Sequence, residues 1–111
     1  MPESKKVQLR SERSERDTRN LWAYCDAEGN LHIDGQDLGP ATAMVSSDGE
    51  YEWFHTIAAE HVPRVLALLG GEPGSNILEL LKERFCGENS YELERRLRES
   101  DIPMDLHTWS G

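Results

Sequence analysis

Long apolar runs are missing from this sequence. No stretch approaches the roughly 18 consecutive apolar residues that a membrane-spanning helix needs, and the N-terminus lacks the apolar segment of a signal peptide. Only 37% of the 111 residues are hydrophobic, whereas 30% are charged. Because domains most often contain about 100–150 residues, we expect one small cytoplasmic domain that makes no membrane contact.

Cysteine is also scarce, and the usual catalytic and cofactor motifs are missing. Cys25 and Cys86 stand alone, without CxxC or Cys/His spacing, so we predict core thiols rather than a disulfide or a metal pair. No GxSxG elbow surrounds Ser46 or Ser47. The glycine-rich segment ALLGGEPGSN lacks the lysine and the preceding strand of a phosphate loop. We therefore expect no cofactor and favour a protein that is not an enzyme.

Positive charge is scarce outside the first twenty residues. Residues 1–20 contain six Lys/Arg and four Asp/Glu, a net charge of +2, whereas residues 21–111 contain six and seventeen, a net charge of −11. Such an acidic body repels phosphate backbones, which argues against nucleic-acid binding, and it attracts basic partners. The N-terminal segment has little apolar material besides Val7 and Leu9, too little to offset the entropy of ordering it. We therefore predict a disordered charged tail over residues 1–20 and a single domain over residues 21–111.

The body does contain segments that are typical of strands. Residues 21–26 (LWAYCD) and 30–34 (NLHID) predict a hairpin around an AEGN turn. Residues 35–40 (GQDLGP) are expected to end the second strand, because glycine and proline favour chain reversal. The strongest strand candidate is residues 50–58 (EYEWFHTIA). Aromatic side chains fall on both of its faces, which favours a central position in a sheet.

Three amphipathic segments and a last strand follow. Helices are predicted over residues 59–71, 75–87 and 89–100, with Ser75 as the N-cap of the second helix, and a strand over residues 102–110. The order is strand–strand–strand–helix–helix–helix–strand. This order predicts an α+β domain with a mostly antiparallel four-stranded sheet and helices packed on one face.

The third helix carries charges at regular spacing. Asn89 and Glu92 have the spacing of a capping box at its start. Glu92 and Arg96, and likewise Glu94 and Arg98, lie four residues apart and predict ion pairs on a solvated surface.

The segment from Asn30 to Pro40 clusters three potential metal ligands with two glycines and a proline. His32 and Asp34 would share one face of a strand, since side chains two residues apart point the same way, but a third ligand is not marked. Turn chemistry accounts for the same residues, with Asp37 bonding to its own backbone. We interpret the segment as the end of a strand followed by a loop.

The histidines support a rival interpretation as a small enzyme or a metal- or ligand-binding domain. If the last strand pairs with the strand at residues 50–58, His55 and His107 come close together, near His61 and Glu60 at the following helix start. Such a group could perform acid–base chemistry or bind a metal. The alternative is that each histidine is separately satisfied by its neighbours.

An acidic and aromatic segment provides the best indication of function. Asp48, Glu50 and Glu52 flank Tyr51 and Trp53, and acids around an aromatic anchor are typical of surfaces that bind a basic protein partner. The competing interpretation is a solvated strand edge with core aromatics. We predict these five residues as the partner-binding site of a monomer or weak homodimer.

The order of elements over residues 21–111 also carries a resemblance. A short hairpin, the GQDLGP segment, a YEWF strand, amphipathic helices and a terminal aromatic strand together resemble small acidic bacterial proteins of uncharacterised families. In size and charge the chain is similar to immunity proteins that neutralise basic nuclease toxins. The resemblance implies an inhibitor-like interaction protein and transfers no binding residue.

Overall fold

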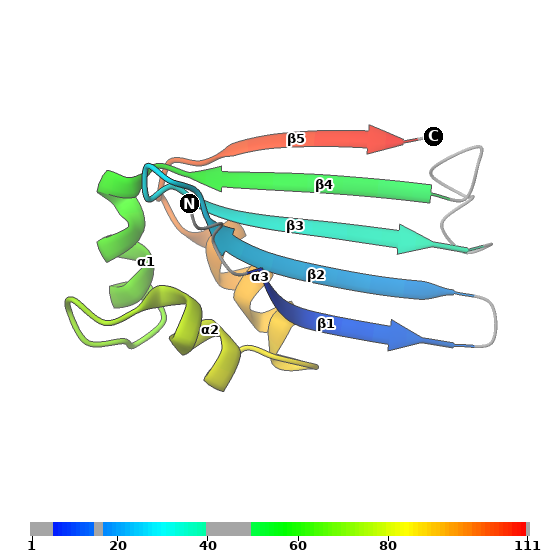
Figure 1. Ribbon diagram of the computed structural model, residues 1–111, viewed down its shortest axis with the longest axis horizontal. Helices are drawn as coiled ribbons and strands as arrows, with labels where there is room; N and C mark the ends of the chain where they lie inside the picture. The colour runs from blue at the N-terminus through cyan, green and yellow to red at the C-terminus, as the bar shows by residue number, and fades with distance from the viewer. Residues whose placement is uncertain (1–5, 15–16, 40–49, 111) are drawn as a thin grey trace.

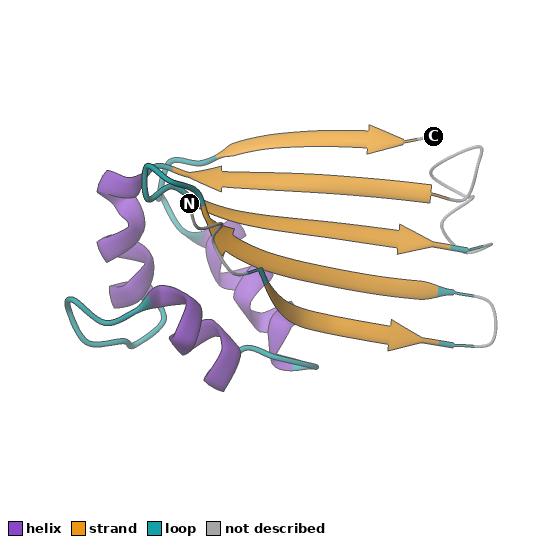
Figure 2. Cartoon of the chain, in the orientation of Figure 1, coloured by secondary structure: helices purple, strands orange, loops and turns teal. Residues whose placement is uncertain are grey.

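The computed structural model describes residues 6–14, 17–39 and 50–110. Its five strands form one antiparallel sheet in which the order in space equals the order along the chain (Figure 1). A 3-10 helix and three α-helices connect the fourth strand to the fifth (Figure 2). The elements are β1 (Val7–Arg13), β2 (Thr18–Cys25), β3 (Leu31–Leu38), β4 (Glu50–Ile57), η2 (Ala59–His61), α1 (Val62–Leu68), α2 (Ile77–Arg84), α3 (Asn89–Glu99) and β5 (Asp105–Ser110). The predicted α+β class with an antiparallel sheet is confirmed.

The sheet has five strands rather than four, because Val7–Arg13 forms β1 instead of a disordered tail. Leu9 is buried in the core, and its carbonyl accepts a hydrogen bond from the backbone N–H of Gly87 at 2.7 Å. Arg10 is also buried and has ion-pair and hydrogen-bond partners in α3. The prediction of a tail over residues 1–20 was wrong here, since it counted apolar residues and had no means of seeing partners some 80 residues away.

β3 continues through the segment that was expected to end it. Residues 35–38 pair with β4 in unbroken register, and Gly35 lies opposite Trp53. A Cβ atom at position 35 would lie 2.1 Å from indole atom Cε2 of Trp53, so the glycine makes room for the ring. The chain reversal of the β2–β3 hairpin falls at the predicted AEGN turn, where Gly29 has a φ of 88° and Asp26 accepts hydrogen bonds from the backbone N–H groups of Glu28 and Asn30.

The N-caps of α2 and α3 differ from the residues predicted for them. Asn76, not Ser75, is the N-cap of α2, and its side-chain oxygen accepts hydrogen bonds from the N–H groups of Leu78 and Glu79 at 2.9 and 3.2 Å. The N-cap of α3 is Glu88, which makes no side-chain capping bond. The predicted capping box is therefore absent from this helix start.

The core lies against one face of the sheet, here called the inner face. Its strand residues alternate along the chain with those of the opposite, outer face, because successive strand side chains point to opposite sides. The inner face contributes Leu21, Ala23, Leu31, Ile33 and Ile57 to one cluster with the buried residues of α1, α2 and α3. The outer face carries Trp22, Tyr24, His32, Asp34 and Phe54, on the alternate positions of β2, β3 and β4.

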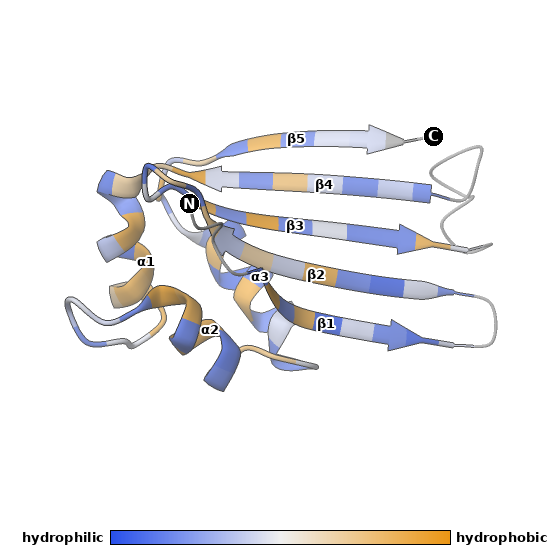
Figure 3. Ribbon diagram, viewed as in Figure 1, coloured by the Kyte–Doolittle hydropathy of each residue, from blue (hydrophilic) through white to orange (hydrophobic). Residues whose placement is uncertain are grey.

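The strands extend well past the helices. In Figure 1, α3 lies behind the sheet and α1 and α2 lie beside one end, whereas the other end has no described helix behind it. Hydrophobic segments concentrate in the half of the sheet next to the helices (Figure 3). The inner face therefore changes from packed core to accessible surface along β3, β4 and β5.

The two cysteines behave as the sequence predicts. Both are free and half-buried, and both pack against the core. Among the described residues, no helix is long and apolar enough to cross a membrane.

Candidate functional site: an inner-face pocket and an acidic outer face

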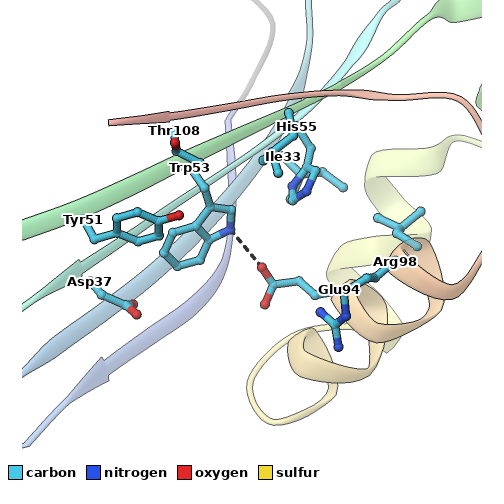
Figure 4. Close-up of a pocket in the computed structure, with 10 residues that line it drawn as sticks. Ile33, Asp37, Tyr51, Trp53, His55, Glu94, Arg98 and Thr108 are labelled. Carbon is cyan, nitrogen blue, oxygen red and sulfur yellow. Dashed lines mark hydrogen bonds between the residues drawn. The ribbon is translucent and has the colours of Figure 1, made fainter. Parts of the chain in front are cut away.

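A pocket of about 430 Å³ opens where the inner face leaves the cover of α3 (Figure 4). Strands β3, β4 and β5 form its floor and α3 forms one wall. Its apolar lining comes from Ile33, Leu97 and Leu106, and its polar groups from Asp37, Tyr51, Trp53, His55, Glu94, Arg98 and Thr108. This size falls within the roughly 300–1,000 Å³ range of small-ligand pockets.

Trp53 is held in one orientation from two sides. Its ring lies over Gly35, whose missing side chain leaves the space that the indole fills. Its Nε1–H donates a hydrogen bond to Glu94 Oε2 at 3.0 Å (Figure 4). The ring centroid of Tyr51 lies 5.8 Å from that of Trp53, with the planes inclined by 30°. The pocket thus has an aromatic wall that is fixed before any ligand arrives.

The second oxygen of Glu94 joins a buried ion pair. Arg10 Nη2 lies 2.6 Å from Glu94 Oε1, and the two side chains are only 2% and 16% exposed. Arg10 Nε donates to Ser90 Oγ at 2.8 Å, and its guanidinium carbon lies 3.5 Å from the ring centroid of Tyr91. Glu94 therefore binds one side chain from β1 and one from β4. The predicted surface pair of Glu94 with Arg98 is wrong.

Asp37 is the least satisfied polar group of the pocket. Its Oδ1 is buried and has no hydrogen-bond partner among the described residues. Burial raises the pKa of Asp37, and the nearby charges of Arg19 and Arg10, which favour the ionised form, do not outweigh it. Oδ1 of the carboxyl group therefore lacks a hydrogen-bond donor within the described part of the chain.

His55 lines the same pocket at a distance from Asp37. Burial lowers the pKa of His55, against the opposing effect of the Glu94 and Asp34 carboxylates. An imidazole with a lowered pKa is neutral at neutral pH, so His55 adds no positive charge to the pocket.

The histidines of the rival interpretation do not come together. His55 is opposite Leu106 in the β4–β5 register, whereas His107 is opposite Phe54, so the two imidazoles lie on opposite faces of the sheet. His61 lies on η2, with its Nε2 3.3 Å from the carboxylate of Glu60. The part of the chain that the structure describes contains no group of three or more His, Cys, Asp or Glu residues placed to hold a metal ion.

His32 and Asp34 do share a face, as alternation predicts, but they belong to a hairpin rather than to a metal site. His32 Nε2 lies 2.8 Å from Asp26 Oδ2, and its ring stacks on Tyr24 with centroids 4.6 Å apart. The hydrogen bond with His32 is the main reason that the pKa of Asp26 lies well below its usual range. Asp37 points to the inner face, away from His32 and Asp34.

The predicted partner-binding residues are divided between two faces. Asp48 lies outside the described residues. Tyr51 and Trp53 face the inner pocket, whereas Glu50 and Glu52 alternate with them and lie on the outer face. Their role in binding a partner remains a prediction.

Carboxylates crowd one another on the outer face. Burial raises the pKa of Glu52, and a hydrogen bond and the charge of Glu50, together with the charge of Asp34, raise it further. No ion pair joins Glu50 or Glu52 to a cation in the described ranges. Opposite Glu52 on the neighbouring strand lies Trp109, which is 50% exposed.

Sequence reasoning missed Arg10 and Trp109. Arg10 sits in a segment with few apolar residues, and its partners are in α3, so no local pattern marks it. The sequence does offer a signal for Trp109, because it lies three residues from Leu106 in a strand and the two side chains must point to opposite faces. In the structure Trp109 is 50% exposed and Leu106 is 59% exposed. Both residues lie on β5, an edge strand of the sheet.

Comparison with known proteins adds no relative. No family model, no curated protein sequence and no solved structure matches this chain.

Proposed function

We propose that this protein is a non-enzymatic interaction domain that binds a basic protein partner through the outer face of β4 and β5. The observation that carries the proposal is the crowding of Glu50, Glu52 and Asp34 beside the half-exposed Trp109. Carboxylates that raise one another's pKa gain free energy when a cation arrives between them. A basic surface supplies such cations.

We place the binding surface on β4 and β5 because a cation of the chain itself already covers the aromatic side chains of β2 on the outer face. Lys6 Nζ lies 5.3 Å from the ring centroid of Tyr24 and 5.8 Å from that of Trp22, so a cation of the chain itself covers the aromatic side chains of β2. Trp109 and Glu52 have no such cover from the described cations. An exposed tryptophan supplies an anchor, and the acids around it steer a basic partner.

The charge of the chain and its resemblance to immunity proteins support the same class of partner. The chain carries a net charge of −9, which speeds association with a basic protein and disfavours nucleic acid. We place this interaction in the cytoplasm, since a reducing compartment keeps free cysteines such as Cys25 and Cys86 in the thiol form. A weak homodimer through the edge strand β5 is a separate proposal, which sedimentation velocity tests.

Capture of partners from lysate by matched variants tests the proposal. Wild type should enrich a basic protein at low salt and lose it at high salt, because salt screens exposed charges over about 8 Å at physiological ionic strength. The amount of captured protein should fall at least tenfold with the double variant Glu50→Gln/Glu52→Gln. It should fall by a similar factor with the separate variant Trp109→Ala. The control pair Glu72→Gln with Glu83→Gln removes the same charge from exposed positions outside the sheet and should retain it. Equal loss in the control pair would show a general charge effect and contradict a defined surface.

A further inference from the structure

The inner-face pocket holds chemistry that an outer-face interaction does not use. At one end of the pocket Asp37 presents a buried oxygen without a hydrogen-bond partner among the described residues. Tyr51 lies directly opposite Asp37 in the β3–β4 register, and Trp53 lies two residues further along the same face. In Figure 4 the Asp37 side chain lies beside the rings of Tyr51 and Trp53. A lone acceptor beside two aromatic faces is complementary to a ligand that has both N–H donors and a flat positive charge.

We propose that this pocket binds a guanidinium group, stacked on Trp53 and Tyr51 and donating N–H hydrogen bonds to Asp37. A guanidinium is planar and weakly hydrated, it stacks on aromatic rings, and its fork of donors matches a carboxylate. Pairing with a charged donor satisfies a buried carboxylate better than a neutral hydrogen bond does. A guanidinium can therefore bind the Asp37 carboxylate and stack on the two aromatic rings at the same time.

None of the described charged groups around the pocket donates a hydrogen bond to Asp37 Oδ1, although Arg19 lies opposite Asp37 in the β2–β3 register. Glu94 is committed to Arg10 and Trp53, so it holds the aromatic wall and is not an open acceptor. Arg98 lies at the opposite end of the pocket from Asp37 in Figure 4. Burial keeps His55 neutral at neutral pH by lowering its pKa. Arg10 and Arg19 act on Asp37 through their charges, but neither supplies the missing hydrogen bond to Oδ1.

The shape of the pocket also fits an arginine side chain. Its volume of about 430 Å³ exceeds what a guanidinium needs and leaves room for an aliphatic stem, for which the exposed side chain of Leu106 offers an apolar contact. A lysine ammonium is a compact, strongly hydrated charge, which gains less from flat aromatic walls. The guanidinium could belong to an arginine residue of a polypeptide or to a small molecule, and the two sources are separated experimentally. This inference does not depend on the proposed outer-face interaction, because the pocket lies on the opposite side of the sheet.

Titration of the full-length ¹⁵N-labelled chain followed by NMR tests the proposal. The probes are N-acetyl-arginine-N-methylamide, which represents an arginine residue, agmatine, which represents a small guanidinium, and the corresponding capped citrulline and capped lysine. We expect the indole N–H of Trp53 and the amides of Gly35 and Asp37 to shift saturably with a guanidinium probe. The indole signal of Trp22, on the outer face beneath Lys6, should stay in place. Capped citrulline, which has nearly the shape of arginine but no charge and fewer N–H donors, should bind at least tenfold more weakly.

Matched variants locate the binding. Asp37→Asn should weaken guanidinium binding at least tenfold. Glu72→Gln is the control, since it removes one negative charge from an exposed position outside the sheet. Should Asp37→Asn fail to fold, Tyr51→Leu provides a second test and should weaken binding several-fold through the lost ring. No saturable shift with either guanidinium probe, equal binding of citrulline, or unchanged binding in Asp37→Asn would each overturn the proposal.

Discussion

Arg10 and Glu94 form a buried ion pair 2.6 Å long between the first strand and the last helix. The pair joins two parts of the chain that lie 84 residues apart. Glu94 also accepts the Trp53 indole N–H, so one carboxylate fixes the edge strand β1, the helix α3 and the aromatic wall of the pocket. The integrity of the pocket therefore depends on a contact with β1, which lies at the far edge of the sheet from β5.

Replacing Arg10 should destabilise the protein strongly. Arg10→Met leaves the Glu94 carboxylate without its cation in a mostly buried site, and removal of one partner of such a pair costs about 3–5 kcal/mol. The free energy of unfolding, measured by urea denaturation, checks this. Arg13→Met is the control, because Arg13 is exposed on the same strand, and its effect should stay within about 0.5 kcal/mol. A small effect of Arg10→Met would show that the Arg10–Glu94 pair contributes little to the stability of the protein.

Gly35→Ala should clash with the indole of Trp53. The added Cβ would lie 2.1 Å from the ring, and overpacking of this kind costs about 1–3 kcal/mol. The same substitution in a Trp53→Ala background should cost much less, because the atoms it meets are gone. A double-mutant cycle of unfolding free energies measures the coupling. Equal costs in both backgrounds would mean that the glycine is required by the backbone and not by the ring.

Asp37 should make stability depend on pH. Burial raises the pKa of Asp37 in the folded protein, so the folded state binds this proton more readily than the unfolded chain does. Its contribution is most favourable below the ordinary carboxyl pKa of about 4 and is lost as the pH rises through the raised folded value. Asp37→Asn does not titrate, and its stability relative to wild type should therefore increase between pH 4 and pH 7.

Urea denaturation at several pH values measures this difference. Glu72→Gln, at an exposed position, is the control and should show little change relative to wild type over the same range. A difference between Asp37→Asn and wild type that stays constant with pH, or falls, would contradict a raised pKa of Asp37 in the folded protein.

Several elements could be predicted from sequence because their signals are local. The alternation of residues 50–58 identifies β4, the AEGN turn identifies the β2–β3 hairpin, and glycines mark the helix ends. The pairing of Glu92 with Arg96 at four-residue spacing was also correct, with Arg96 Nε 2.9 Å from Glu92 Oε2. Each of these features depends on neighbours within one turn of helix or one hairpin.

The features that escaped prediction depend on distant contacts. β1 has too few apolar residues to look like a strand, and it is ordered by Leu9 in the core and by the partners of Arg10 in α3. Glu94 and Arg98 have ideal spacing, yet Glu94 is drawn inward by Arg10 and Trp53. The separation of His55 from His107 follows from the β4–β5 register, which a one-residue shift would reverse. No local pattern determines that register.

The start of α2 offers a test of which residue caps the helix. Asn76 accepts two backbone hydrogen bonds through its side chain, whereas Ser75 contributes a backbone N–H to Glu72 and no side-chain cap. Asn76→Ala should therefore lower the free energy of unfolding by about 1 kcal/mol. Ser75→Ala, the neighbouring control, should change it by less than about 0.5 kcal/mol. The reverse order of effects would place the helix start one residue earlier, as the sequence alone suggests.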